Sequence, residues 1–165
     1  MKQRKEIGML SDTTPQNETV IACDPSALTP YQQERWVKEI VPKLYSAVQE
    51  IQELPNGWAW RLPSTPEILL LLAEDLNMER VCCPFVHYTL EIGPNRAPFW
   101  LRWTGDEGVK EFLRMGFESA NLFDPQVAKD AGLDVPADAE MDSVETALEA
   151  VNRLNERYAR VADSG

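Results

Sequence analysis

The chain has few basic residues, one histidine, three cysteines and no long hydrophobic run, and each shortage excludes a class of protein. Its 16 lysines and arginines are outnumbered by 27 acids, which gives a net charge of −11. Such a chain lacks the basic face that neutralises nucleic-acid phosphates or anionic lipids, so we expect no nucleic acid and no membrane among its partners. The longest apolar run covers residues 68–73, far short of the roughly 20 residues of a transmembrane helix.

Three cysteines are too few for a disulfide scaffold, and a chain of 165 residues can bury a core without one. The basic residues at the start of the chain are not followed by the apolar stretch of a secretory signal. We therefore expect a cytoplasmic protein whose cysteines are thiols and form disulfides only in a redox reaction. The sequence contains no glycine-rich phosphate loop, H-E-x-x-H motif or EF-hand loop, so no catalytic residues are predicted.

The hydrophobic periodicity predicts an α+β fold. Residues 19–23 read as a short strand, and cap signals at Thr29, Thr65 and Thr104 begin three helices, the first of which Pro42 should kink. Asn56-Gly57 and Gly93-Pro94-Asn95 each separate two alternating runs, which is typical of β-hairpins. The resulting order, β-α-ββ-α-ββ-α, favours an antiparallel or mixed sheet of about five strands with helices packed on one face.

The composition divides the chain into three parts. Residues 1–17 are polar and predict a disordered lead-in, and residues 18–116 form the α+β domain. Residues 117–165 hold 11 acids and 4 bases, so this extension of loop and helix carries −7 of the net charge. Its last helix, which Asp142-Ser143 caps, is amphipathic and should pack on the domain or on a second subunit as a homodimer contact.

The chemically informative stretch is residues 79–87. On a helix, Glu79 lies three residues before Cys82 and four before Cys83, so its carboxylate is placed beside both thiols. Leu72, Leu76, Glu79 and Cys83 share one helical stripe, and an acid on an apolar stripe requires a reason. Cys23 would join the pair if its strand lies beside the strand after Cys83. These residues, with His87, are typical ligands of Zn or another soft metal ion.

Other interpretations of this stretch stay open. Adjacent cysteines lack the C-x-x-C spacing of most zinc sites, and neighbouring side chains on a helix diverge by about 100°. Both could bind one ion only if the helix distorts before Pro84. Free cysteine is often plain core packing, and a histidine on the polar side of a strand is more often a surface residue. A cysteine nucleophile is a further interpretation.

A different class of function rests on the tryptophans of the predicted strands. These could line an aromatic pocket for a small planar ligand, although aromatics on alternating strands more often belong to the core: Trp58, Trp60, Trp100 and Trp103. The chain would then be a non-enzymatic ligand-binding or protein-interaction module. Our favoured hypothesis is a thiol-rich site that binds a soft metal ion or undergoes reversible oxidation.

Four segments also carry a resemblance: residues 22–28, 53–63, 79–85 and 100–105. Together they resemble a group of small bacterial proteins that share a Glu-Arg-x-Cys-Cys-Pro-Phe segment and have no established activity. The resemblance covers roughly residues 18–115. It implies that Cys23, Glu79, Cys82 and Cys83 form the site, and it does not include His87. The group usually has leucine where this chain has Val86.

Overall fold

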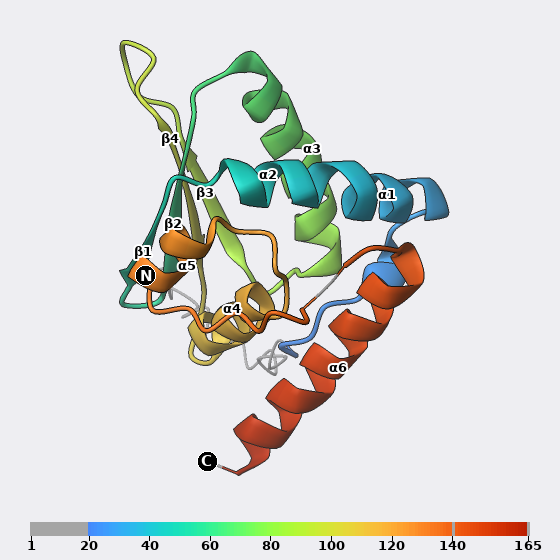
Figure 1. The fold of residues 1–165 in the computed structure, drawn as a ribbon. Coiled ribbons are helices and arrows are strands. Elements are labelled where there is room, and N and C mark those ends of the chain that lie inside the picture. Colours follow the sequence, from blue (N-terminus) through green and yellow to red (C-terminus); the bar gives the residue numbers. More distant parts are fainter. Residues whose placement is uncertain (1–19, 140, 165) are drawn as a thin grey trace, which may run out of the picture.

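A computed structural model describes residues 20–139 and 141–164 of the chain. The predicted disordered lead-in, residues 1–17, lies outside these residues. In the described part, the chain folds as an α+β protein with one sheet of four antiparallel strands (Figure 1). No described helix is both long enough and apolar enough to cross a membrane.

The sheet consists of two hairpins placed side by side. Its strands are β1 (Glu50–Leu54), β2 (Gly57–Leu62), β3 (His87–Glu91) and β4 (Phe99–Thr104), in the order β1-β2-β4-β3. The predicted α+β fold with an antiparallel sheet is confirmed, and so are both hairpins. Gly57 begins β2 where a Cβ atom would lie 1.8 Å from the carbonyl oxygen of Trp103. Only glycine lets the two hairpins approach so closely at this point.

The fifth strand, predicted at residues 19–23, is wrong for the described residues 20–23, which have no regular secondary structure. The backbone of Cys23 and the N–H of the next residue, Asp24, are paired without a neighbouring strand. The Asn155 side chain accepts from the Cys23 N–H at 2.9 Å and donates to the Cys23 carbonyl at 2.8 Å. The Asp24 N–H donates to the Cys82 carbonyl at 2.8 Å. These partners satisfy the backbone groups of Cys23 that a neighbouring strand would otherwise pair.

The helices pack on one face of the sheet (Figure 1). Trp60 and Leu101 point to this face and are buried, whereas their neighbours Arg61 and Arg102 point to the other face and are only half-buried. The elements around the sheet are η1 (Pro25–Ala27), α1 (Pro30–Arg35), the π-helical turn η2 (Trp36–Ile40), α2 (Val41–Ala47), α3 (Pro66–Cys82), α4 (Val109–Glu118), α5 (Pro125–Asp130) and α6 (Val144–Asp163). Pro42 follows the π turn, where the Val41 N–H bonds to the Trp36 carbonyl.

Three of the four strand tryptophans belong to the core. Trp58, Trp60 and Trp103 are 1–3% exposed and contact one another or Phe117 through their rings. Trp100 lies on the opposite face of the sheet and is half-buried. These indoles therefore form no open aromatic face for a partner, which removes the main support for an interaction module built on them.

Helix α6, in the acidic part of the chain, packs against α4 and η2 of the same chain (Figure 1). Its Ala147 is fully buried, and the Tyr158 ring meets the Phe112 ring of α4 edge-on at 5.4 Å. The apolar stripe that the sequence predicts for this helix thus lies on its own domain. This placement brings α6 to the end of α3, where the cysteines lie.

Candidate functional site

Two of the three cysteines stand where α3 ends. Pro84 cannot continue a helix, because it has no N–H and its ring disfavours the helical conformation of the residue before it. Cys83 accordingly leaves the helical region, with φ −123° and ψ 69°, while its N–H still bonds to the Glu79 carbonyl at 2.7 Å. The end of the helix is therefore distorted before Pro84, as it must be if both cysteines are to bind one ion. This distortion lets the side chains of Cys82 and Cys83 reach one place although they are adjacent in sequence.

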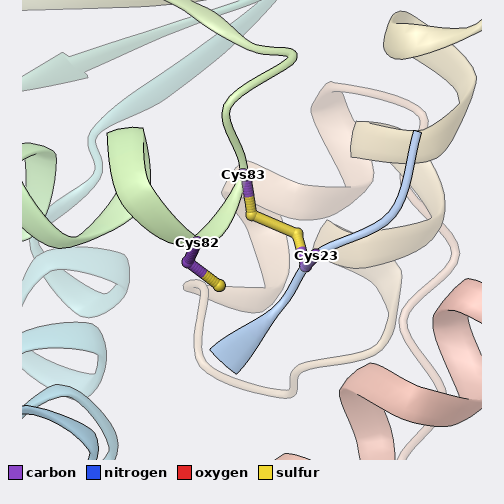
Figure 2. A group of neighbouring side chains, drawn as sticks. All are labelled: Cys23, Cys82 and Cys83. Carbon is purple, nitrogen blue, oxygen red and sulfur yellow. A yellow bond between two sulfur atoms is a disulfide. The ribbon is translucent and has the colours of Figure 1, made fainter. Parts of the chain in front are cut away.

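Cys23 approaches the same place from the segment before η1. It forms a disulfide with Cys83 across 60 residues of sequence, and the two Cα atoms are 4.7 Å apart. Cys82 is a buried free cysteine. Figure 2 shows its sulfur on the side of α3 that faces the Cys23 segment. All three sulfurs lie within 4.8 Å of one another. The structure therefore brings together the three predicted sulfur donors, with two of them oxidised.

Asn155 of α6 holds Cys23 in place, and sequence reasoning missed this residue. Its side-chain amide bonds to both the N–H and the carbonyl of Cys23, so it pairs the backbone of Cys23 as a neighbouring strand would. Nothing in the sequence marks Asn155, because a polar residue on an amphipathic helix is expected to face solvent. Helix α6 thus contributes directly to the site.

Replacing Asn155 with alanine should lower the free energy of unfolding by about 1–3 kcal/mol, because two backbone groups of Cys23 lose their partner. Urea denaturation of the oxidised protein measures this. Asn152→Ala is the matched control, since Asn152 is an exposed asparagine on the same helix, and it should change stability by less than about 0.5 kcal/mol. Equal effects of the two substitutions would show that the Asn155 contact contributes nothing.

Two buried carboxyl groups lie beside the sulfurs. Asp75 and Glu79 are one turn apart on α3 and only 4% and 9% exposed. Burial raises the pKa of Glu79 to about 7, while hydrogen bonds from Trp36 and Tyr88 oppose the rise. Burial, and then the charge of Glu79, raise the pKa of Asp75 well above its usual range. No basic side chain of the described residues offsets either shift, so this place disfavours negative charge unless a cation is present.

Asp75 was missed from the sequence, although a signal was present. The predicted stripe of Leu72, Leu76, Glu79 and Cys83 shares Leu72 and Glu79 with the buried face, but Leu76 is only half-buried and Asp75 is buried in its place. The buried stripe runs along α3 with helical spacing through Ile68, Leu72, Asp75, Glu79 and Cys82. The run of four leucines before it fits either stripe. Two acids, Asp75 and Glu79, interrupt that apolar stripe. This interruption is the sequence signal that would have identified Asp75.

The thiol of Cys82 is not activated in this state. Burial and then the charge of Glu79 raise its pKa to about 12, although a backbone hydrogen bond from Asp24 opposes the rise. A nucleophilic cysteine needs a thiolate near neutral pH, and usually a cationic neighbour to stabilise it. The surroundings of Cys82 are the opposite, which argues against the cysteine-nucleophile interpretation.

His87 lies apart from the sulfurs. It is exposed and begins β3, where side chains alternate between the two faces, whereas the next residue, Tyr88, points inward to Glu79. The Tyr88 hydroxyl donates to Glu79 Oε2 at a long 3.5 Å. Among the described residues, the group of ligand atoms close enough to share an ion contains the three cysteines alone. Glu79 is adjacent to this group rather than within it.

A cavity of about 90 Å³ adjoins the sulfurs. All three cysteines and Glu79 line it, and most of the remaining lining is aromatic or aliphatic, including Tyr88, Trp103, Phe117, Val151 and Leu154. The cavity lies between the sheet, α2, the end of α3, α4 and α6, so residues of the α+β core and of the last helix line it together. The site therefore combines three sulfurs, a carboxyl pair and an apolar space.

Comparison of the chain with protein-family models, with curated proteins and with solved structures finds no match.

Proposed function

We propose that the chain binds a soft metal ion through Cys23, Cys82 and Cys83 when the Cys23–Cys83 disulfide is reduced. The single observation that supports this is the approach of three sulfurs from two distant segments to within 4.8 Å of one another. Thiolates prefer soft ions such as Cu(I), Hg(II) and Zn(II). Three sulfurs alone suit a soft ion of low coordination number, and Glu79 is the nearest further donor for a tetrahedral Zn(II).

The charge around the sulfurs favours a cation. Asp75 and Glu79 are buried without a basic partner among the described residues, and the Cys82 thiol is held neutral by the same burial. A bound metal ion reverses this, because a coordinating thiol loses its proton and the ion's charge stabilises nearby carboxylates. The burial and nearby acids that keep the Cys82 thiol protonated, and so make it a poor nucleophile, would thus be offset by the charge of a bound metal ion.

Oxidation would switch this site off. The disulfide joins two of the three sulfur donors, and adding two electrons and two protons returns them as two thiols. We therefore propose that the protein works in a reducing compartment, consistent with the expected cytoplasmic location.

The test is a titration of the reduced protein with Cu(I), Hg(II) and Zn(II), followed by thiolate-to-metal absorption for the first two and by competition with a chelator for Zn(II). We expect one ion per chain. The double variant Cys82→Ser/Cys83→Ser should bind at least 100-fold more weakly, because a single sulfur remains.

The oxidised wild-type protein is the matched control, since it has the same sequence and differs only in the disulfide. It should bind as weakly as the double variant. Weak and equal binding by the reduced protein, the oxidised protein and the variant would contradict the proposal.

A further inference from the structure

The cavity beside the sulfurs is larger than a bare metal ion requires. An ion bound to three sulfurs is surrounded by its ligands, whereas the cavity adds about 90 Å³ next to them. An engineered cavity of about 150 Å³ is known to admit benzene, so the space here is the size of a small alkyl group. Since Cys23, Cys82 and Cys83 themselves line the cavity, a group attached to a metal ion on their sulfurs can extend into it.

The lining of the cavity selects for an apolar occupant. Apart from Glu79 and Ser119, its lining is mostly rings and aliphatic side chains from the sheet, α2, α4 and α6, including Trp103, Phe112, Phe117, Val151 and Leu154. Water gains little in such a space, because a buried water needs two to four polar partners. A small alkyl group gains by leaving water. The sulfurs and the cavity together thus match a ligand with a soft end and an apolar end.

We propose that the ligand of this site is a soft metal cation that carries a small alkyl group, with Cys82 bound to the metal and the alkyl group in the adjoining cavity. This rests on the proposed function and specifies its ligand class. For an alkylmercury chloride, the Cys82 S–H and the Hg–Cl bonds break and the S–Hg bond forms. The thiol proton and chloride leave, the carbon–mercury bond stays intact, and no electron is transferred.

This ligand class has a distinctive dependence on the redox state. An alkylmercury cation needs one thiolate, and Cys82 is free while Cys23 and Cys83 form their disulfide. A bare Hg(II) ion needs at least two. The oxidised protein should therefore still bind one alkylmercury per chain while it binds Hg(II) at least 100-fold more weakly than the reduced protein does.

The decisive experiment fills the cavity and leaves the sulfurs unchanged. Gly116→Val and Leu154→Trp both add volume inside it, since the two residues line the cavity and a Cβ at Gly116 would lie 3.4 Å from Leu154. Val161→Trp is the control, because Val161 is 48% exposed on the same helix as Leu154 and does not line the cavity. Each reduced protein is titrated with methylmercury, ethylmercury and Hg(II) chlorides against free cysteine as competitor.

The wild type and the control should prefer ethylmercury to methylmercury by about fourfold relative to free cysteine, which corresponds to one buried methylene. The filled variants should lose this preference and at least tenfold in ethylmercury affinity, while their Hg(II) affinity stays within about twofold, which also shows that they fold. Equal methyl and ethyl affinities in the wild type, with Hg(II) bound stoichiometrically, would overturn this inference alone. Failure to bind Hg(II) would overturn the proposed function with it.

Discussion

Reduction of the Cys23–Cys83 disulfide should lower the free energy of unfolding by about 4 kcal/mol. The disulfide joins residues that are 60 apart in sequence, and a loop of that size removes this much conformational freedom from the unfolded chain in the chain-entropy description. Urea denaturation with and without a reductant that does not bind metals measures the difference. A loss of this size is a large fraction of the 5–15 kcal/mol typical of a domain.

Cys23→Ala provides the control for reductant effects unrelated to the disulfide. It cannot form this bond, so its stability should be low and should not respond to the reductant. Cys82→Ala removes a buried sulfur of the same cluster but no crosslink, so it should respond to the reductant as the wild type does. A reductant effect of similar size in Cys23→Ala would contradict the assigned pairing.

The same disulfide opposes the proposed metal site. The disulfide stabilises the oxidised protein, but it makes two sulfur donors unavailable to a metal ion. The reduced protein loses this stabilisation and recovers it only by binding an ion. An ion present at 1,000 times its dissociation constant contributes about 4 kcal/mol, which is comparable to the loss on reduction. Reduction in the presence of a soft metal ion should therefore leave the stability of the wild type nearly unchanged, a comparison that the same denaturation experiment includes.

Local signals in the sequence predicted much of the fold. Thr29 and Thr65 cap their helices as predicted, the first with a complete capping box. The first hairpin forms where predicted, although its turn is Pro55-Asn56 and Gly57 already pairs with Leu54 as the first residue of β2. Each of these signals involves residues a few positions apart, so the physics that selects them is visible in a short window. The place of Glu79 beside Cys82 and Cys83 was predictable for the same reason.

The parts that could not be predicted depend on distant partners. Residues 20–23 are a short apolar run with two β-branched residues, as a strand would be, but the backbone of Cys23 bonds to a side chain 132 residues away. No periodicity encodes such a contact. The conclusion that Cys23 reaches the pair was right although its stated route, through a neighbouring strand, was wrong. Helix α6 was similarly open between its own domain and a second subunit, because an amphipathic stripe shows that a helix packs without showing on what.

Raising the pH from about 4.5 to about 7 should destabilise the metal-free protein by roughly 3 kcal/mol. The pKa of Glu79 is raised from 4.5 to about 7 by burial, so in this window the folded protein keeps a proton that the unfolded chain releases. Stability falls with pH wherever the folded state binds more protons, and each pKa unit corresponds to about 1.4 kcal/mol. The contribution is complete below the unfolded pKa and is lost as the pH rises through the folded pKa. Asp75 acts in the same direction.

Glu79→Gln should abolish the part of this slope that Glu79 contributes, because a neutral amide of the same shape has no proton to lose, and should leave the part that Asp75 contributes. The variant should resemble the wild type near pH 4.5 and exceed its stability by up to about 3 kcal/mol above pH 7. Glu67→Gln is the control, since the Glu67 side chain is 72% exposed near the start of the same helix, and it should keep the wild-type slope. A stability that rises with pH in the metal-free wild type would mean that Glu79 is ionised and paired in the folded state. A bound cation should favour the ionised form of Glu79, because its charge stabilises the carboxylate. If adding metal flattens the dependence of stability on pH, the carboxyl pair is therefore coupled to the ion.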